Sequence, residues 1–150
     1  MIHNPQIAPM VKEDVPGVME IQAECHLSPW SADSYLTALR SPDFILYTAK
    51  INKNLVGFMA ARLITSGCLC ELLNIGVIPP KQNQKIGEGL VFQLFTTIES
   101  KADRISLEVR EGNSQAIGFY KKYGFNPVGL RKNYYSDPAE NALLMEKMLN

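Results

Sequence analysis

Short stretches rich in hydrophobic and β-branched residues recur along this chain, and in some of them hydrophobic and polar residues alternate. Such stretches are typical of strands that bury one or both faces. The pattern predicts strands at residues 6–10, 44–51, 55–65, 68–77, 104–110, 125–131 and 141–148. The Asn-Lys-Asn segment at 52–54 separates the second strand from the third and predicts a hairpin. We therefore expect three consecutive antiparallel strands in the middle of the chain.

Helical spacing of hydrophobic residues marks further stretches. Asp14 and Ser31 are of residue types that cap helices, and each precedes a short stretch with this spacing. Residues 86–101 carry a hydrophobic stripe that could cover a sheet. Asn113 is expected to cap a last helix, which stops at Gly124 in a left-handed conformation.

The predicted elements follow the order strand, two helices, three strands, helix, strand, helix and two strands. A polar stretch at residues 132–140 predicts a loop between the last two strands. This order predicts an α+β fold with a mixed, mostly antiparallel sheet and helices on its faces. The chain has 150 residues, enough for a substantial core, and we expect one domain over residues 1–150.

Composition narrows the classes of function. Fifteen Lys and Arg residues balance fifteen Asp and Glu residues, so the chain has no basic field of the kind that holds nucleic acids. The chain shows no secretion signal and no hydrophobic run near the roughly 18 residues of a membrane span, so we expect a soluble protein. His3 and His26 are isolated in the sequence, and we expect no metal site.

The cysteines favour a reducing compartment. The chain has three cysteines, an odd number, and Cys68 and Cys70 lie two residues apart in a predicted strand. In a strand this spacing puts both side chains on one face, where we expect them to pack as small apolar groups rather than form bridges. We therefore expect a cytoplasmic protein.

The candidate chemistry lies in residues 72–125. A hydrophobic strand, a Pro-Pro stop and a helix start with Gly87 and Gly89 follow one another there. A helix N-terminus attracts anions through its unpaired N–H groups and its dipole, so this segment predicts a site for a phosphorylated cofactor. In the next strand Glu108 is the lone acid, on the face opposite Leu107 and Val109. From the pattern alone it is either a solvent-facing residue or a proton acceptor.

Four segments of the chain resemble the GNAT-type N-acetyltransferases. They are Ser28-Pro29-Trp30-Ser31, Asn-Ile-Gly-Val-Ile-Pro at 74–79, Leu-Glu-Val-Arg at 107–110 with Asn113 and Tyr120, and Lys-Tyr-Gly-Phe at 122–125 running to Arg-Lys-Asn-Tyr-Tyr at 131–135. More narrowly, the Pro-Trp loop and the Asn-Tyr-Tyr segment resemble bacterial RimI-type enzymes, which acetylate the N-terminal alanine of a small-subunit ribosomal protein. The resemblance covers the whole chain and implies the GNAT fold, with a splayed central strand pair.

The resemblance implies acetyl-CoA as the co-substrate. Ile75, Gly76 and Val77 would pair their backbone with the pantetheine arm, as though the cofactor were an added strand. Asn113 would cap its helix and also touch the cofactor. The pyrophosphate would lie on a loop that consists of Asn83, Gln84, Lys85, Ile86, Gly87 and Glu88.

The family pattern at this loop is Gln or Arg, two residues, Gly, any residue, then Gly or Ala. Aligned without gaps it falls on Gln82, Lys85 and Gly87, so a lysine replaces the first glycine. A lysine brings a Cβ that can crowd the phosphates and an ammonium that can attract them. A second frame on Gln84, Gly87 and Gly89 restores both glycines, but it needs two extra residues after the Pro pair.

The resemblance and the chemistry of acetyl transfer together identify candidate catalytic residues. Glu108 would take a proton from the amine, directly or through water, and Tyr120 would protonate the leaving thiolate. A backbone N–H at Val77 or its neighbour would stabilise the oxyanion. Without the motif, Tyr120 is more typical of a packing residue. The candidate acceptor-binding residues are Trp30, Tyr134 and Tyr135.

We expect an enzyme that transfers acetyl directly from acetyl-CoA to the N-terminal α-amine of an acceptor, by resemblance the alanine of a ribosomal protein. A lysine or small-amine acetyltransferase is the runner-up, because residues 137–141 match the family's Asp-Gly-Glu-Asp-like segment only loosely. From another class, the chain could bind acyl-CoA without catalysis. Lys85 is the best support for such a binding module.

Overall fold

Seven strands form a single sheet in the computed structural model, which describes residues 4–149. In chain order they are β1 (Gln6–Pro9), β2 (Phe44–Ile51), β3 (Asn54–Ile64), β4 (Leu69–Val77), β5 (Arg104–Arg110), β6 (Asn126–Ser136) and β7 (Ala139–Met148). The α-helices are α1 (Val15–Glu24), α2 (Ala32–Leu39), α3 (Ile86–Ile98) and α4 (Ser114–Lys122). The predicted order of strands and α-helices is confirmed.

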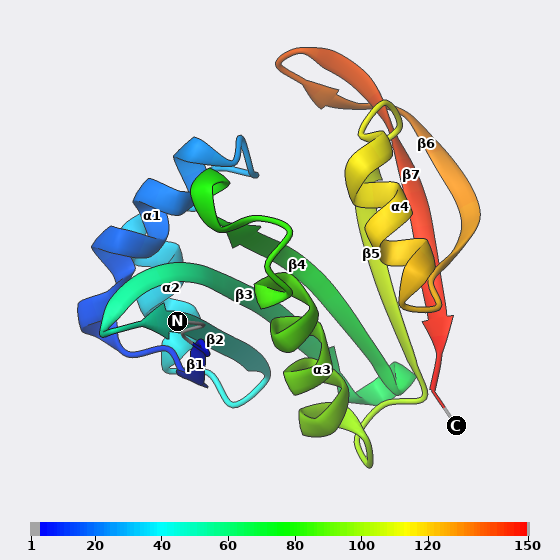
Figure 1. Ribbon diagram of the computed structural model, residues 1–150. Helices are drawn as coiled ribbons and strands as arrows, with labels where there is room; N and C mark the ends of the chain where they lie inside the picture. The colour runs from blue at the N-terminus through cyan, green and yellow to red at the C-terminus, as the bar shows by residue number, and fades with distance from the viewer. Residues whose placement is uncertain (1–3, 150) are drawn as a thin grey trace.

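A wedge opens in the middle of this sheet. The strand order is β1-β2-β3-β4-β5-β7-β6, and the described strands pair antiparallel except β4 and β5, which run parallel. Their pairing joins residues 69–72 to residues 104–107 and ends at Leu72 and Leu107. Figure 1 shows the two strands diverging from that point. This is the splayed central pair that we expected.

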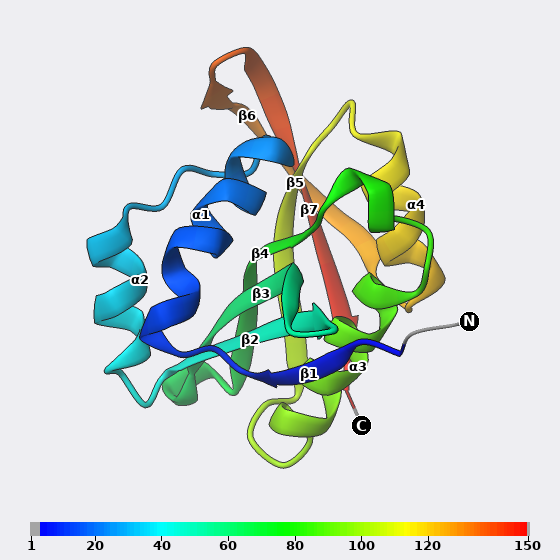
Figure 2. The ribbon, with the colours of Figure 1, turned by 60° about the vertical axis from the view of Figure 1, so that its left-hand side comes forward.

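Helices cover both faces of the sheet. Figure 2 shows α1 and α2 together on one side, with α3 and α4 on the other. Val18 of α1 packs in one hydrophobic core with Phe58 of β3, whereas Leu90 of α3 packs in a second core with Met59 of the same strand. Successive residues of β3 therefore serve two different cores, as alternation of side chains across a strand requires.

The turn and cap chemistry mostly follows the predictions. Asn52 and Lys53 form the turn between β2 and β3 with φ angles of 51° and 68°. Ser31 accepts a hydrogen bond from the Ser34 N–H at 3.1 Å and caps α2. Asn113 likewise accepts from the Ala116 N–H at 3.1 Å and caps α4. The predicted helix over 86–101 ends earlier, at Ile98.

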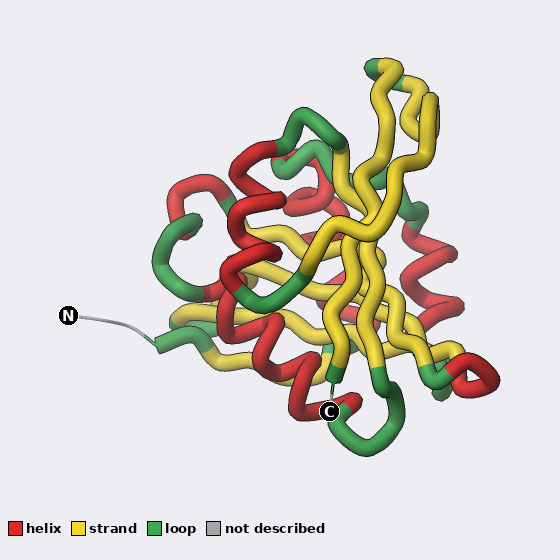
Figure 3. Tube along the Cα trace, turned by 90° about the vertical axis from the view of Figure 1, so that its right-hand side faces the viewer, coloured by secondary structure: helices red, strands yellow, loops and turns green. Residues whose placement is uncertain are grey.

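The predicted loop at residues 132–140 is wrong. β6 continues through Ser136 and β7 begins at Ala139, so the two strands form a long hairpin whose tip projects beyond the rest of the sheet (Figure 3). Tyr134 and Tyr135 therefore lie in a strand rather than in a loop. The pairing also skips residues between Arg131 and Tyr135. A bulge of this size interrupts the local pattern that would have predicted a strand.

Two other local predictions are wrong. Asp14 stands before α1, but its Oδ2 accepts from the Val11 N–H at 2.9 Å and its Oδ1 pairs with Lys50 at 2.8 Å, so it does not cap the helix. Cys68 is exposed with φ 52° at the end of a 3-10 turn, whereas Cys70 is buried in β4. The two thiols therefore do not share a strand face.

No helix within residues 4–149 combines the length and the apolar character needed to cross a membrane.

Candidate active site

The free half of β4 turns part of its backbone toward the wedge. The Ile78 N–H donates to the Val56 carbonyl at 2.9 Å. In an antiparallel pair every second residue bonds to the partner strand, so Ile75 and Val77 turn their N–H and C=O groups away from β3. Because β5 has diverged on that side, an extended ligand can pair there in its place. The geometry therefore fits a pantetheine arm.

Two side chains already bond to the Val77 carbonyl. Gln82 Nε2 donates to it at 2.9 Å, and the Cys25 thiol donates at 3.3 Å. Burial raises the pKa of the Cys25 thiol, which keeps it a neutral donor. A ligand that pairs with β4 would therefore use the Val77 N–H and the backbone groups of Ile75.

A β-bulge shapes the point where β4 leaves β5. Ala60 pairs with Asn74 and Ala61 pairs with Leu72, so Leu73 is an extra residue in β4. A bulge bends its strand and increases the local twist. Leu73 follows directly after the last residue of β4 that pairs with β5. The bulge therefore accounts for the change of direction that opens the wedge.

A groove with a volume of about 490 Å³ lies where the wedge begins. Leu72 and Leu107, the last paired residues of β4 and β5, form part of its lining. Its other lining residues include Glu108 of β5, Trp30 from the α1–α2 connection, and Arg131, Tyr134 and Tyr135 of β6. The structure thus brings together four of the predicted site residues, Glu108, Trp30, Tyr134 and Tyr135.

Glu108 presents one unpaired oxygen. Its Oε1 lies 3.7 Å from Arg131 Nη1, a contact between partly exposed side chains. Its Oε2 is buried, and no group among the described residues donates a hydrogen bond to it. A buried carboxylate oxygen without a donor costs free energy, which a bound N–H group or water would recover. The carboxylate is therefore suited to receive an amine.

Tyr134 and Tyr135 stand beside that carboxylate. Contact with the Glu108 carboxylate is the largest of the causes that raise the pKa of Tyr134. Burial comes first and the charge of Glu108 second among the causes that raise the pKa of Tyr135. Both phenols therefore stay neutral and can donate hydrogen bonds in the groove.

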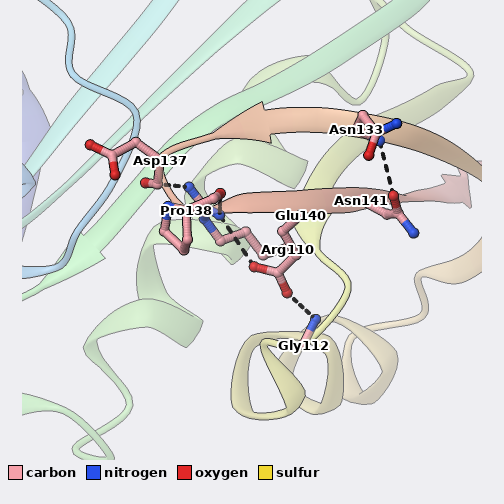
Figure 4. Close-up of polar contacts among 7 residues, drawn as sticks. All are labelled: Arg110, Gly112, Asn133, Asp137, Pro138, Glu140 and Asn141. Carbon is pink, nitrogen blue, oxygen red and sulfur yellow. Dashed lines mark hydrogen bonds and ion pairs between the residues drawn. The ribbon is translucent and has the colours of Figure 1, made fainter.

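A polar clamp fixes the tip of the β6–β7 hairpin above the end of β5 (Figure 4). Arg110 of β5 donates to the Pro138 carbonyl at 2.9 Å and to the Asp137 carbonyl at 3.2 Å. Its guanidinium also pairs with Glu140 at 3.2 Å. Glu140 accepts from the Gly112 N–H at 2.7 Å, which ties the hairpin to the segment before α4. The tyrosines of β6 are thereby held over the groove.

Tyr120 packs against the core that contains Leu107 and Val109 of β5, which is the face of that strand opposite Glu108. It is on α4, and its ring is 5.7 Å from that of Phe125 and 5.5 Å from that of Phe119. Burial raises the pKa of its phenol, with a smaller contribution from Tyr135. The structure does not include Tyr120 among the residues that line the groove. The two candidate catalytic groups thus approach the wedge from opposite faces.

The loop before α3 carries an unusual backbone. Lys85, the N-cap residue of α3, has φ 65°, and Asn83 has φ 64°. Glycine adopts this left-handed conformation freely, whereas a residue with a Cβ does so at a cost. The gap-free frame puts the family's first glycine at Lys85, and this conformation favours that frame. Ile86 is buried in the core, so only its backbone is available to a ligand.

The glycines of the second frame have packing reasons of their own. A Cβ on Gly87 would come within 3.3 Å of the Phe119 ring of α4, and a Cβ on Gly89 would come within 2.9 Å of Ile7. Beside Gly87, Glu88 accepts a hydrogen bond from the Tyr123 hydroxyl at 2.6 Å, which raises the pKa of that tyrosine to about 12. The contacts of Gly87 and Glu88 join α3 to α4 and to the residue that ends it, whereas the contact of Gly89 joins α3 to β1.

Several polar residues around the site could not be recognised as such from the amino-acid sequence, or were not among the predicted site residues. Arg110 clamps the hairpin, and Gln22 and Asn74 bond to the loop that carries Trp30. Asn74 interrupts a hydrophobic run much as Glu108 does, which is a signal that could have been used. Arg110 and Gln22 have no such signal, because their partners are distant in sequence. Residues 4–149 contain no group of His, Cys, Asp and Glu side chains placed to hold a metal ion.

Comparison with known proteins gives consistent matches. A sequence model of the Acetyltransferase (GNAT) family matches residues 15–125. A Bacillus subtilis (strain 168) protein, provisionally named ribosomal protein bS18-alanine N-acetyltransferase, is 36% identical over 140 residues, 92% of this chain and 91% of that protein. The Escherichia coli (strain K12) protein named ribosomal protein bS18-alanine N-acetyltransferase is 33% identical over 144 residues, 93% of this chain and 94% of that protein.

Solved structures show the same fold. The crystal structure of the ribosomal-protein-S18-alanine N-acetyltransferase from Escherichia coli superposes with a TM-score of 0.87 and 27% identity, over 97% of this chain and 94% of that chain. Ard1 from Thermoplasma volcanium gives a TM-score of 0.88 and 25% identity, over 98% of this chain and 99% of that chain.

Proposed function

This chain belongs to the acetyltransferase (GNAT) family, and from that premise we propose that it acetylates the N-terminal alanine of a ribosomal protein. It is an acetyl-CoA-dependent N-acetyltransferase, as the family and its relatives are. The relatives named for bS18 support the choice of acceptor, because they align with more than nine-tenths of this chain. The acceptor would place the enzyme in the cytoplasm, acting through the single domain of residues 1–150.

An α-amine suits a site with one carboxylate base. The amine must be neutral to attack, and at neutral pH a lysine side chain needs about 3.5 kcal/mol more than an α-amine to lose its proton. Glu108 would take the proton from the attacking nitrogen through its unpaired Oε2, directly or by way of a water molecule. Trp30, Tyr134 and Tyr135 would line the path of the acceptor's first residues.

Tyr120 would supply the proton that the departing thiolate needs. Its pKa is raised by burial, so the phenol carries its proton throughout the neutral range. The Val77 N–H, turned into the wedge, would donate to the carbonyl oxygen as that oxygen becomes anionic. Acetyl-CoA supplies the thioester when it is bound. The residues proposed to hold it are Ile75 and Val77 along the arm, with Gly76 between them bonded to β3, and Asn83, Gln84, Lys85, Ile86, Gly87, Glu88 and Asn113 near the phosphates.

The observation that carries this proposal is the unpaired oxygen of Glu108 in a groove at the base of the wedge. Glu108→Gln keeps the shape of the side chain but removes its basicity. We expect kcat for an alanine-initiated peptide to fall about 100-fold or more, with little change in acetyl-CoA affinity. Single-turnover kinetics and calorimetric titration of acetyl-CoA measure the two quantities.

Glu146→Gln is the matched control, because Glu146 lines the same groove from β7 and pairs there with Arg104. It should leave kcat within about threefold of the wild-type value. An unchanged kcat in Glu108→Gln would reject Glu108 as the base. Mass spectrometry of the wild-type product identifies the acceptor group: acetylation of a lysine side chain alone would favour the runner-up function, and acetyl-CoA binding without any product would favour a binding module.

A further inference from the structure

The loop at residues 28–30 forms one wall of the groove. It connects α1 to α2 and carries Trp30, whose ring lies 5.1 Å from that of Tyr35 and 6.2 Å from that of Phe44. Trp30 and Phe44 line both the groove and a neighbouring hollow on the α2 side. The position of this loop therefore sets the width of the groove on the side of α1 and α2.

Two buried amide side chains hold the loop by its backbone. Gln22 of α1 donates from Nε2 to the Trp30 carbonyl at 3.0 Å. Asn74 of β4 donates from Nδ2 to the Ser28 carbonyl at 3.3 Å. The exposed fractions of Gln22 and Asn74 are 6% and 5%, so both amides have been removed from water. The loop is thus bonded to α1 through the Trp30 carbonyl and to β4 through the Ser28 carbonyl.

Tyr35 links the two amides. It is fully buried, and its hydroxyl donates to Gln22 Oε1. Burial raises the pKa of Tyr35 to about 12, and contact with Asn74 offsets part of this effect. The phenol therefore remains a neutral donor that fixes which way the Gln22 amide points. With its oxygen taken by Tyr35, Gln22 presents its NH₂ group to the loop.

Burying such a network in a core costs more free energy than burying apolar side chains of the same volume. A buried amide loses the hydrogen bonds of water and is tolerated only when all its partners are in place, whereas apolar side chains would fill the same volume without that risk. What the amides add is direction. Asn74 follows the Leu73 bulge and precedes Ile75, so one short piece of β4 holds both the loop wall and the backbone turned into the wedge.

We propose that Gln22 and Asn74 are positioning residues. They fix the loop at 28–30 relative to β4, so that the acceptor amine is aligned with the backbone of β4 that is turned into the wedge. Neither side chain touches the reacting atoms. They act through the loop, with Tyr35 orienting the Gln22 amide. The proposal rests on the proposed function for its kinetic part, because the acceptor is taken to be an alanine-initiated peptide.

The test uses variants that keep shape but cannot donate. Gln22→Met and Asn74→Leu remove the amide, and Gln22→Glu keeps an oxygen for Tyr35 while placing a second oxygen against the Trp30 carbonyl. We expect KM for an alanine-initiated peptide to rise about tenfold in each, with kcat and acetyl-CoA affinity within about threefold of wild type. Trp30 is the chain's single tryptophan, so its fluorescence emission should also shift to the red.

Tyr47→Phe is the matched control. It removes one part-buried hydrogen bond, from Tyr47 to Thr97 at 3.0 Å, between β2 and α3 on the opposite face. It should change neither the peptide KM nor the emission of Trp30. Folded variants of Gln22 and Asn74 that keep the wild-type emission, or that keep the wild-type KM, overturn the proposal, and the two Gln22 variants decide it if Asn74→Leu does not fold. If the wild-type protein does not acetylate the peptide, the proposed function fails, but the emission of Trp30 still tests the positioning.

Discussion

At the scale of single residues, Lys85 concentrates opposing effects in the candidate cofactor loop. Its left-handed φ of 65° is a conformation in which a Cβ is unfavourable. Lys85 is also the N-cap residue of α3, so its ammonium adds positive charge near a helix N-terminus that already favours anions. Neighbouring Asn83 adopts nearly the same φ, but asparagine tolerates it better. The strain and the charge of Lys85 can be separated by substitution.

Lys85→Ala removes the charge but keeps the Cβ, whereas Lys85→Gly removes both. We expect the glycine variant to be about 1 kcal/mol more stable to urea unfolding than the alanine variant, because glycine adopts this backbone without strain. Both variants should lose acetyl-CoA affinity by about threefold to tenfold, since both lose the ammonium. A glycine variant that binds acetyl-CoA more tightly than wild type would show instead that the lysine crowds the phosphates.

The raised pKa of Tyr120 predicts how kcat depends on pH. Burial raises its pKa above the ordinary 10.0, so the phenol keeps its proton to higher pH than an exposed tyrosine would. If Tyr120 is the acid, kcat should not decline through loss of that proton below about pH 10, and it should fall about tenfold or more in Tyr120→Phe. A pH profile of kcat for the wild type checks this. A decline centred well below the ordinary tyrosine value, absent from Tyr120→Phe, would contradict the raised pKa.

Single residues also differ in how much of their role the amino-acid sequence predicts. Glu108 could be singled out because it interrupts a hydrophobic strand, and the structure leaves one of its oxygens without a donor. The ion pair with Arg131 could not be foreseen in this way, because β6 pairs with β7 rather than with β5, and the β6–β7 register includes two irregularities. Pairings across bulges depend on tertiary structure rather than on local pattern.

At the scale of elements, the β6–β7 hairpin departs most from the sequence prediction. Its tip carries polar residues and a proline, which locally favour a loop. The Arg110 side chain overrides that preference by bonding to two carbonyls of the turn, and its guanidinium also lies 4.2 Å from the centre of the Tyr135 ring. By contrast, the caps of α2 and α4 were predictable, because each lies beside the helix that it caps.

Arg110→Gln tests whether this clamp holds the groove wall. We expect it to lower the free energy of unfolding by about 1–2 kcal/mol and to raise the acceptor KM several-fold, with acetyl-CoA affinity unchanged. Arg104→Gln is the control at the other end of the same strand, where the arginine pairs with Glu146 at 3.8 Å. Urea unfolding and steady-state kinetics supply the data. Equal effects of the two substitutions on KM would argue against a specific role for the hairpin clamp.

At the scale of the whole molecule, the sheet consists of two parts joined at a short parallel pairing. β1 to β4 form one part, and β5 to β7 form the other. Contacts between α3 and α4, such as the hydrogen bond from Tyr123 to Glu88, connect the parts again on one face. The order of elements and the antiparallel strands were predictable, but the depth of the wedge depends on where one bulge falls in β4.

Hydrogen exchange can test the wedge directly. The amides of Ile75 and Val77 should exchange quickly in the free protein, because they point to the side that β5 has left. Acetyl-CoA at 100 times its dissociation constant should slow both and stabilise the fold by about 2.7 kcal/mol. Amides in the paired residues 69–72 should be slow in both states. Equal exchange at Ile75 and Val77 with and without acetyl-CoA would exclude backbone pairing there.

The bulged, diverging β4 has a kinetic consequence. The groove with Glu108 opens beside the α1–α2 connection, whereas the loop with Lys85 leads into α3 on the reverse side of the sheet. Acetyl-CoA and the acceptor peptide would therefore enter the site from opposite sides of the sheet, and neither would block the other. Such a layout favours a ternary complex over a ping-pong cycle, and free CoA should then compete with acetyl-CoA but not with the peptide.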